Sequence, residues 1–147
     1  MELSESYLRA SNKLADAEAE YKSEVLKMRD VLIDELKSII SKNSELASIS
    51  WQQFTPSFAD GDVPEFTCHG IYGDIDLNYC GNDNIPNNGF PKTFTQEQKD
   101  QFRKLQKEVH TILCKLKQED YQIMFGDPVE VTVTINGYTK EYCCNVN

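Results

Sequence analysis

The sequence has no lysine or arginine between Lys42 and Lys92. Over the whole chain of 147 residues, 24 acidic residues outnumber 15 basic ones, which gives a formal net charge of −9. Nonspecific binding of nucleic acid depends on basic side chains that neutralise phosphates. The charge balance therefore argues against a nucleic-acid-binding protein and favours a basic protein surface as the partner.

Long apolar segments are absent as well. No run of about 18 apolar residues occurs, so the sequence predicts no membrane-spanning helix. The first residues lack the basic and apolar regions of a secretory signal peptide. The length and composition are typical of one soluble globular domain, and we expect a cytoplasmic protein.

The residue types that enzymes most often use are sparse. The chain contains only 2 His, and it has no glycine-rich phosphate loop and no serine nucleophile elbow. A nucleophile pair of Cys68 or Cys80 with His110 can be written, but no oxyanion loop accompanies it. The sequence therefore predicts a protein that is not an enzyme.

Residues 1–47 contain neither glycine nor proline, and their apolar side chains recur at a mean spacing of about 3.6 residues, the α-helical period. A helix of this length spans roughly 60 Å, so part of it must project from a small domain. The second half of the stripe is the stronger, and we expect it to pack on the domain formed by residues 48–147. The first half is expected to meet another helix, from a second copy or a partner, or to remain a solvated helix. The stripe consists of Leu3, Tyr7, Ala10, Leu14, Ala17, Tyr21, Val25, Met28, Leu32, Leu36 and Ile39.

Residues 48–147 combine strands with one further helix. Short aromatic and β-branched segments predict a strand at residues 51–54 and a hairpin of residues 65–72 and 74–79 that turns near Gly73. Thr95 and Gln98 have the spacing of a capping box, which predicts a helix that begins there.

The C-terminal segment predicts a hairpin. Residues 129–135 alternate between apolar and polar side chains, as in a half-buried strand. Asn136 and Gly137 favour a two-residue turn, which would pair Ile135 with Tyr138. The fold class is therefore α+β: a long N-terminal helix, an antiparallel sheet of about five strands, one further helix packed on the sheet and a C-terminal β-hairpin.

The excess negative charge is concentrated in the central segment, because the two flanking segments are nearly balanced. Such a cluster attracts a basic cleft and can imitate a row of phosphates. The alternative is that the carboxylates are solvated turn residues that favour solubility. The candidate partner-binding residues are Asp60, Asp62, Glu65, Asp74 and Asp76.

Five cysteines, an odd number, exclude a fully paired disulfide framework and indicate a reducing compartment. Thiolate and imidazole groups bind zinc, and a sheet that joins the central hairpin to the C-terminus could assemble a tetrahedral site. The spacing includes no Cys-x-x-Cys motif, so buried or surface thiols remain the alternative. The candidate zinc ligands are Cys68, His69, Cys80, Cys143 and Cys144.

Two segments resemble small proteins of tailed bacteriophages and prophages. The first runs from Trp51-Gln52-Gln53-Phe54-Thr55-Pro56 through residue 62 and continues in residues 65–70, and the second is residues 125–133, which begin Phe-Gly-Asp-Pro. Other members carry acidic and His residues near the C-terminus, where this chain has Tyr-Cys-Cys-Asn at residues 142–145. The departure puts a metal site shared with that group in doubt.

The resemblance implies a role against host defence, because some small acidic phage proteins are anti-CRISPR inhibitors that block DNA loading onto Cas9. We therefore expect a noncatalytic inhibitor in the host cytoplasm that acts as an acidic mimic of DNA in a basic cleft, without binding nucleic acid or a membrane. The alternatives are a phage assembly module that forms a homodimer through its coiled-coil helix, and a zinc-stabilised binding protein.

Overall fold

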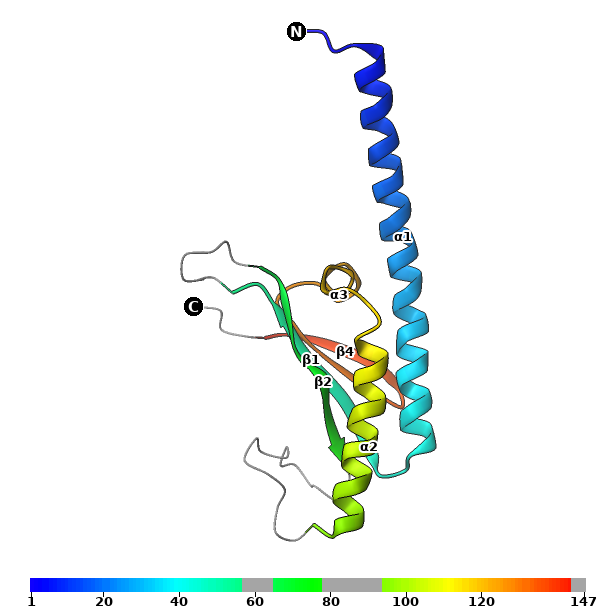
Figure 1. Ribbon diagram of the computed structural model, residues 1–147, viewed down its shortest axis with the longest axis vertical. Coiled ribbons are helices and arrows are strands. Elements are labelled where there is room, and N and C mark those ends of the chain that lie inside the picture. Colours follow the sequence, from blue (N-terminus) through cyan, green and yellow to red (C-terminus); the bar gives the residue numbers. More distant parts are fainter. Residues whose placement is uncertain (57–64, 78–93, 144–147) are drawn as a thin grey trace.

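The computed structural model describes residues 1–56, 65–77 and 94–143, with residues 69–77 described by their backbone. Helix α1 (Glu5–Lys42) begins after Ser4, whose side-chain oxygen accepts a hydrogen bond from the Tyr7 amide at 3.2 Å. Its N-terminal half projects beyond the other elements (Figure 1). Val25 is the first buried residue of the helix, and the buried positions continue to Ile40. The prediction of one long N-terminal helix is confirmed, and its second half packs on α3 and on strands of the sheet.

Four strands form one antiparallel sheet in the order β2-β1-β3-β4. This confirms the α+β class, although the sheet has four strands where the sequence predicts about five. The strands are β1 (Leu46–Phe54), β2 (Thr67–Leu77), β3 (Val129–Thr134) and β4 (Gly137–Tyr142).

The predicted central hairpin is wrong. β2 continues through Gly73, and it pairs with β1 on both sides of residues 70–73, so the segment forms one strand where the sequence predicts two. The pairing register shifts between Ser50 and Gln52 of β1, which pair with Asp74 and His69. An irregularity of the ladder therefore replaces the predicted turn, because β-bulges take up extra residues without reversing the strand.

The C-terminal hairpin is present, but its register differs from the prediction by two residues. Gly137, with φ +129°, pairs with Thr134, so Ile135 and Asn136 form the turn. This register places Tyr138 opposite Val133, and the Tyr138 ring packs edge-on against Phe125 at 5.4 Å between centroids. Packing of the partly buried tyrosine ring against the core favours this register, and Ile135 lies half exposed in the turn.

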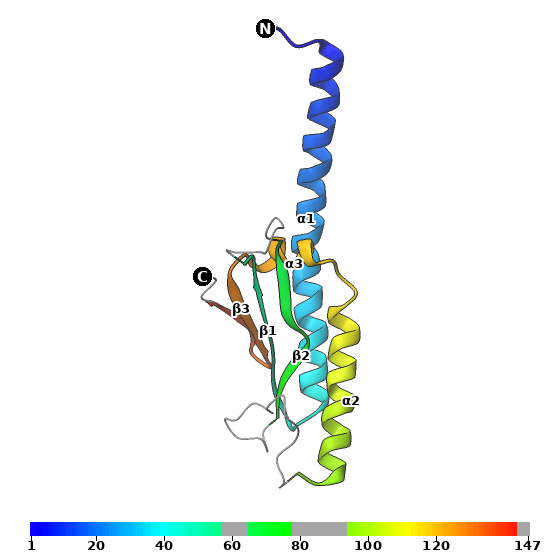
Figure 2. The ribbon, with the colours of Figure 1, turned by 60° about the vertical axis from the view of Figure 1, so that its left-hand side comes forward.

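Two helices cover one face of the sheet, and a third lies at its end (Figure 2). Helix α2 (Gln96–Leu113) begins at Thr95 with the predicted capping box to Gln98 and packs on β2 beside α1. Helix α3 (Gln118–Phe125) was not predicted. Its eight residues are too few to establish an apolar period, so its burial comes from tertiary packing.

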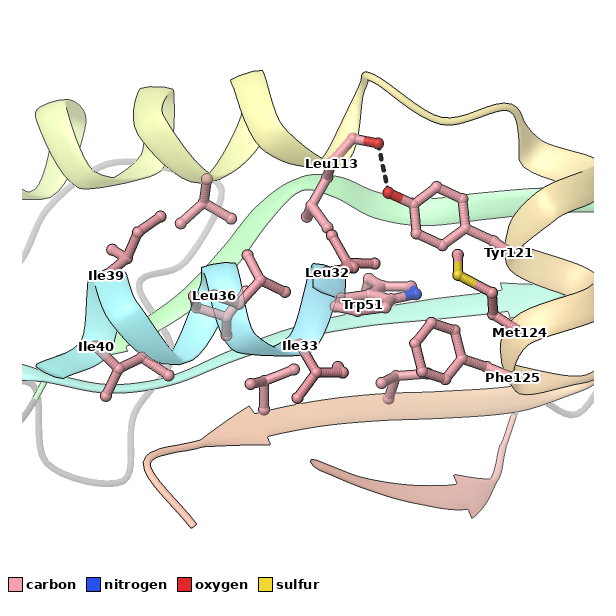
Figure 3. Packing of buried hydrophobic residues seen from close by; sticks show 14 of the residues in the cluster. Leu32, Ile33, Leu36, Ile39, Ile40, Trp51, Leu113, Tyr121, Met124 and Phe125 are labelled. Atoms are coloured by element: carbon pink, nitrogen blue, oxygen red, sulfur yellow. Dashed lines mark hydrogen bonds between the residues drawn. The ribbon is translucent and has the colours of Figure 1, made fainter. Parts of the chain in front are cut away.

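The core lies between α1, α2, α3 and the helix-facing side of the sheet (Figure 3). Leu36, Ile49 and Val131 are completely buried there. Trp51, the only tryptophan, packs edge-on against Tyr121 and Phe125 of α3, with ring centroids 5.9 Å and 5.5 Å away. The Tyr121 hydroxyl donates a hydrogen bond to the carbonyl oxygen of Leu113, which ties α3 to the end of α2.

A buried glutamine joins β1 to the end of α3. The side-chain amide of Gln53 donates to the carbonyl oxygens of Tyr121 and Gly126, at 2.8 Å and 2.7 Å, and its oxygen accepts from the Trp51 indole at 3.0 Å. Nearby, the Thr55 hydroxyl donates to the Asp127 carboxylate at 2.6 Å. The two segments that carry the phage-protein resemblance therefore contact each other here, through hydrogen bonds that join β1 to the end of α3.

None of the described helices is both apolar enough and long enough to cross a lipid bilayer.

Candidate functional site

No described element covers the face of the sheet opposite the helices (Figure 2). Strand alternation sends Trp51, Val131 and Val133 into the core and their neighbours to the other face. Those neighbours are exposed or half-buried. We call them the polar sheet face: Ser50, Gln52, Glu130, Thr132, Thr134, Thr139 and Glu141.

Strand register aligns these residues in two rows across the sheet. One row contains hydroxyl groups, since Ser50 pairs with Thr132 and Thr132 with Thr139. The next row runs from Gln52 through Glu130 to Glu141. The carboxylates and hydroxyls can therefore accept several hydrogen bonds from one flat partner surface.

The seven residues of the polar sheet face include no Lys or Arg. Lys140, the one lysine on the four strands, pairs with the core residue Val131, and its ammonium group donates to the Phe125 carbonyl oxygen at 3.3 Å. It therefore belongs to the helix-facing side, and no described Lys or Arg neutralises Glu130 or Glu141 by a salt bridge.

Glu130 and Glu141 lie directly opposite each other on β3 and β4. Like charges in such a cross-strand pair destabilise a sheet, whereas opposite charges stabilise it. We therefore expect Glu141→Lys to stabilise the free protein by about 0.5 kcal/mol and to raise its Tm by roughly 2 °C at low salt. Differential scanning calorimetry would measure this change, with Glu141→Gln as the control for loss of the repulsion alone. A lower Tm for Glu141→Lys would show that the two carboxylates do not repel each other.

The predicted acidic residues are only partly described. Asp60 and Asp62 lie outside the described residues, and Glu65 is exposed just before β2. Asp74 and Asp76 lie on β2, an edge strand, at the positions paired with Ser50 and Ser48. Strand register thus aligns Asp74 with the hydroxyl row.

The predicted zinc ligands are also divided. Cys80 and Cys144 lie outside the described residues, and His69 occupies the β2 position paired with Gln52. Cys143 is disulfide-bonded, so in that state it has no thiolate to offer a metal ion. This differs from the expectation of reduced cysteines throughout.

Cys68 is a free, half-buried thiol on the helix-facing side of β2, in register with Gln53. Burial raises the pKa of this thiol to about 12, so it stays protonated near neutral pH. Among the described residues, no group of three or more Cys, His, Asp or Glu side chains could hold a metal ion. The zinc site therefore stays a prediction that depends on residues outside the described ranges.

His110 and Cys114 form the one close Cys/His contact in the described ranges. The Cys114 sulfur lies 3.2 Å from Nδ1 of His110, one turn along α2, as their i,i+4 spacing predicts. Both groups lie at the surface, and among the described residues no third Cys, His, Asp or Glu side chain joins them to form a possible metal site. Two ligands of this kind fall short of the four that a structural zinc site requires.

An apolar groove of about 300 Å³ lies between α1 and α2. Met28, Val31 and Leu116 supply apolar side chains to it, while Glu35 and Lys115 supply charges of opposite sign. The groove lies on the helical side of the molecule, away from the polar sheet face. The charges of Glu35 and Lys115 balance, so the groove does not favour a ligand of either charge.

Sequence reasoning missed Glu130 and Glu141 as candidate site residues. The sequence does indicate that three polar side chains share a face, because Glu130, Thr132 and Thr134 alternate with the valines of residues 129–134. Alternation alone predicts only a half-buried strand for this segment. The pairing of Glu130 with Glu141 appears only when the hairpin register is known.

The chain matches no protein-family model, and comparisons with curated proteins and with solved structures find no similar protein.

Proposed function

We propose that this protein is a noncatalytic inhibitor that docks on the basic channel of a host nucleic-acid-handling enzyme and blocks the entry of DNA. The polar sheet face carries this proposal. It presents carboxylates and hydroxyl groups from three strands, next to an edge strand that contains Asp74 and Asp76. A surface with charge of one sign attracts a basic cleft and increases the rate of encounter.

The separation of charge between the faces supports this orientation. The four strands contain four acidic residues and one lysine, and that lysine belongs to the helix-facing side. Helix α2, on the other side of the sheet, contains four basic and three acidic residues. A basic channel would therefore favour the sheet side of the protein over the α2 side.

The resemblance to phage proteins favours Cas9 as the target and a phage or prophage as the source. Cas9-type enzymes read a short duplex motif with arginine side chains and hold nucleic acid in a positively charged channel. Carboxylates form strong bidentate hydrogen bonds with arginine, as phosphates do. We propose that Glu130 and Glu141, together with the predicted acids of the central segment, occupy positions that DNA phosphates would otherwise take.

Binding to a purified complex of Cas9 and guide RNA tests this function. We expect the protein to bind this complex before DNA is loaded and to fail to bind once target DNA fills the channel. We also expect the affinity to fall as ionic strength rises, because salt screens charges over about 10 Å at 0.1 M. Equal affinity for the loaded and unloaded complexes would contradict the proposal.

A second candidate function is favoured by the exposed apolar residues on the projecting half of α1, such as Leu14, which is 73% exposed. A phage assembly module could use this half as a coiled-coil contact. Deletion of residues 1–22 separates the two functions. It should abolish self-association under the assembly function, and it should leave inhibition intact if the polar sheet face is the binding site.

A further inference from the structure

The projecting half of α1 carries an apolar seam that no described residue covers before Tyr21, where α3 begins. Successive members are alternately four and three residues apart, which is the a/d heptad pattern of a coiled coil. The four large side chains are between 47% and 73% exposed, although each has an apolar body. We call this set the α1 seam: Leu3, Tyr7, Ala10, Leu14, Ala17 and Tyr21.

The α1 seam lies on the same side of the helix as the residues that enter the core. Leu14 and Leu32 are 18 residues apart, which corresponds to five turns of 3.6 residues, so their side chains project in the same direction. The same spacing relates Tyr7 to Val25. Leu32 and Val25 are buried against the rest of the molecule. A helix that packs on the seam therefore lies in line with α3 and the sheet.

This placement determines the direction of a partner helix. The Tyr21 hydroxyl donates a hydrogen bond to the buried carboxylate of Asp120, so α3 begins beside Tyr21. A second copy whose α1 ran parallel along the seam would continue past Tyr21 into α3 and the sheet. An antiparallel copy avoids this collision, because its Leu3 lies level with Tyr21 and the rest of its α1 runs back along the projecting half, away from α3.

The α1 seam is self-complementary in the antiparallel direction. A two-fold axis near residue 12 places Tyr7 against Ala17 of the second copy, and Leu14 against Ala10. Each of these inner layers then joins a large side chain to an alanine, so the two helices can interlock there without a void. The outermost layer joins Leu3 to Tyr21. Such a contact uses the same surface on both copies, as a two-fold dimer requires.

We propose that a second copy of this chain covers the α1 seam in an antiparallel helix pair, with the two sheets at opposite ends of the pair. This inference does not depend on the proposed inhibitor function. The paired segment is roughly 28 Å long. The area that it buries is therefore small compared with a standard interface of about 800 Å² per partner. We therefore expect a dimer with a Kd of about 1–50 µM.

Sedimentation equilibrium of the full chain between about 1 and 200 µM tests the dimer, because this range brackets the expected Kd. Leu14→Glu places two carboxylates in the seam of each dimer and should raise the Kd by at least about tenfold. Leu8→Glu is the matched control, because Leu8 is 45% exposed on another side of α1 and the variant has the same net charge. A wild-type monomer at the highest concentration, or an equal effect of both variants, would overturn the proposal.

Cross-linking tests the direction of the helices. In the antiparallel pair Ser11 lies beside its counterpart near the two-fold axis, whereas the two Leu3 residues are roughly 27 Å apart. In a Cys114→Ser background, a short bifunctional maleimide should therefore link Ser11→Cys into dimers and leave Leu3→Cys monomeric. Efficient cross-linking through position 3, or none through position 11, would refute the antiparallel arrangement.

Discussion

Replacing Gln53 by methionine should lower the free energy of unfolding by about 3 kcal/mol or more, and the Tm by roughly 10 °C. Gln53 is completely buried, and it is hydrogen-bonded to the Trp51 indole and to the carbonyl oxygens of Tyr121 and Gly126. Methionine has a similar shape but can donate no hydrogen bond. Each polar group left buried without a partner costs about 1–3 kcal/mol, which explains the size of the expected loss.

Gln52→Met is the matched control for this prediction. Gln52 is the neighbouring glutamine on β1, and its side chain is exposed on the polar sheet face. An exposed substitution of this kind should change stability by no more than about 0.5 kcal/mol. Urea denaturation followed by the fluorescence of the only tryptophan, Trp51, measures both variants. Equal midpoints for the two variants would show that the Gln53 hydrogen bonds contribute little to stability.

The contrast between these two glutamines shows what the sequence could and could not predict. Local patterns predicted α1 from its apolar period, α2 from the Thr95 capping box, and the strand at residues 129–134 from its alternation. Each of these signals lies within one segment of the chain. Adjacent Gln52 and Gln53 look alike in the sequence, and only the alternation of β1 buries one of them.

The features that sequence reasoning missed depend on contacts between distant segments. β2 passes through Gly73 as one strand because β1 pairs with it on both sides of the irregularity at residues 70–73. The hairpin register depends on where the Tyr138 ring meets Phe125, and this register in turn brings Glu130 opposite Glu141. The sequence predicts carboxylates of the central segment as the candidate site, and that choice stays a prediction. The pair on the C-terminal hairpin depends on a register that no local pattern contains.

The double variant Glu130→Lys/Glu141→Lys should weaken binding to the Cas9–guide RNA complex by about thirtyfold at 0.1 M salt, which corresponds to about 2 kcal/mol. Both side chains belong to the polar sheet face, so the variant replaces two attractive charges by two repulsive ones. The loss should shrink as the salt concentration rises, because the interaction is screened. Surface plasmon resonance on the immobilised complex would measure it.

Asp16→Lys/Asp34→Lys is the control for the total charge. Both aspartates are exposed on α1, away from the sheet, and the two double variants have the same net charge. If the polar sheet face is the binding site, the control should bind nearly as well as the wild-type protein. Equal losses for the two double variants would mean that binding depends on net charge alone.

Competition with DNA tests the central claim most directly. Fluorescence anisotropy of labelled target DNA would report its binding to the Cas9–guide RNA complex as the protein is added. The account predicts that the wild-type protein displaces the DNA competitively, so that more DNA restores binding, and that Glu130→Lys/Glu141→Lys does so only at a much higher concentration. DNA binding that stays unchanged at saturating protein would contradict it, as would equal displacement by that variant.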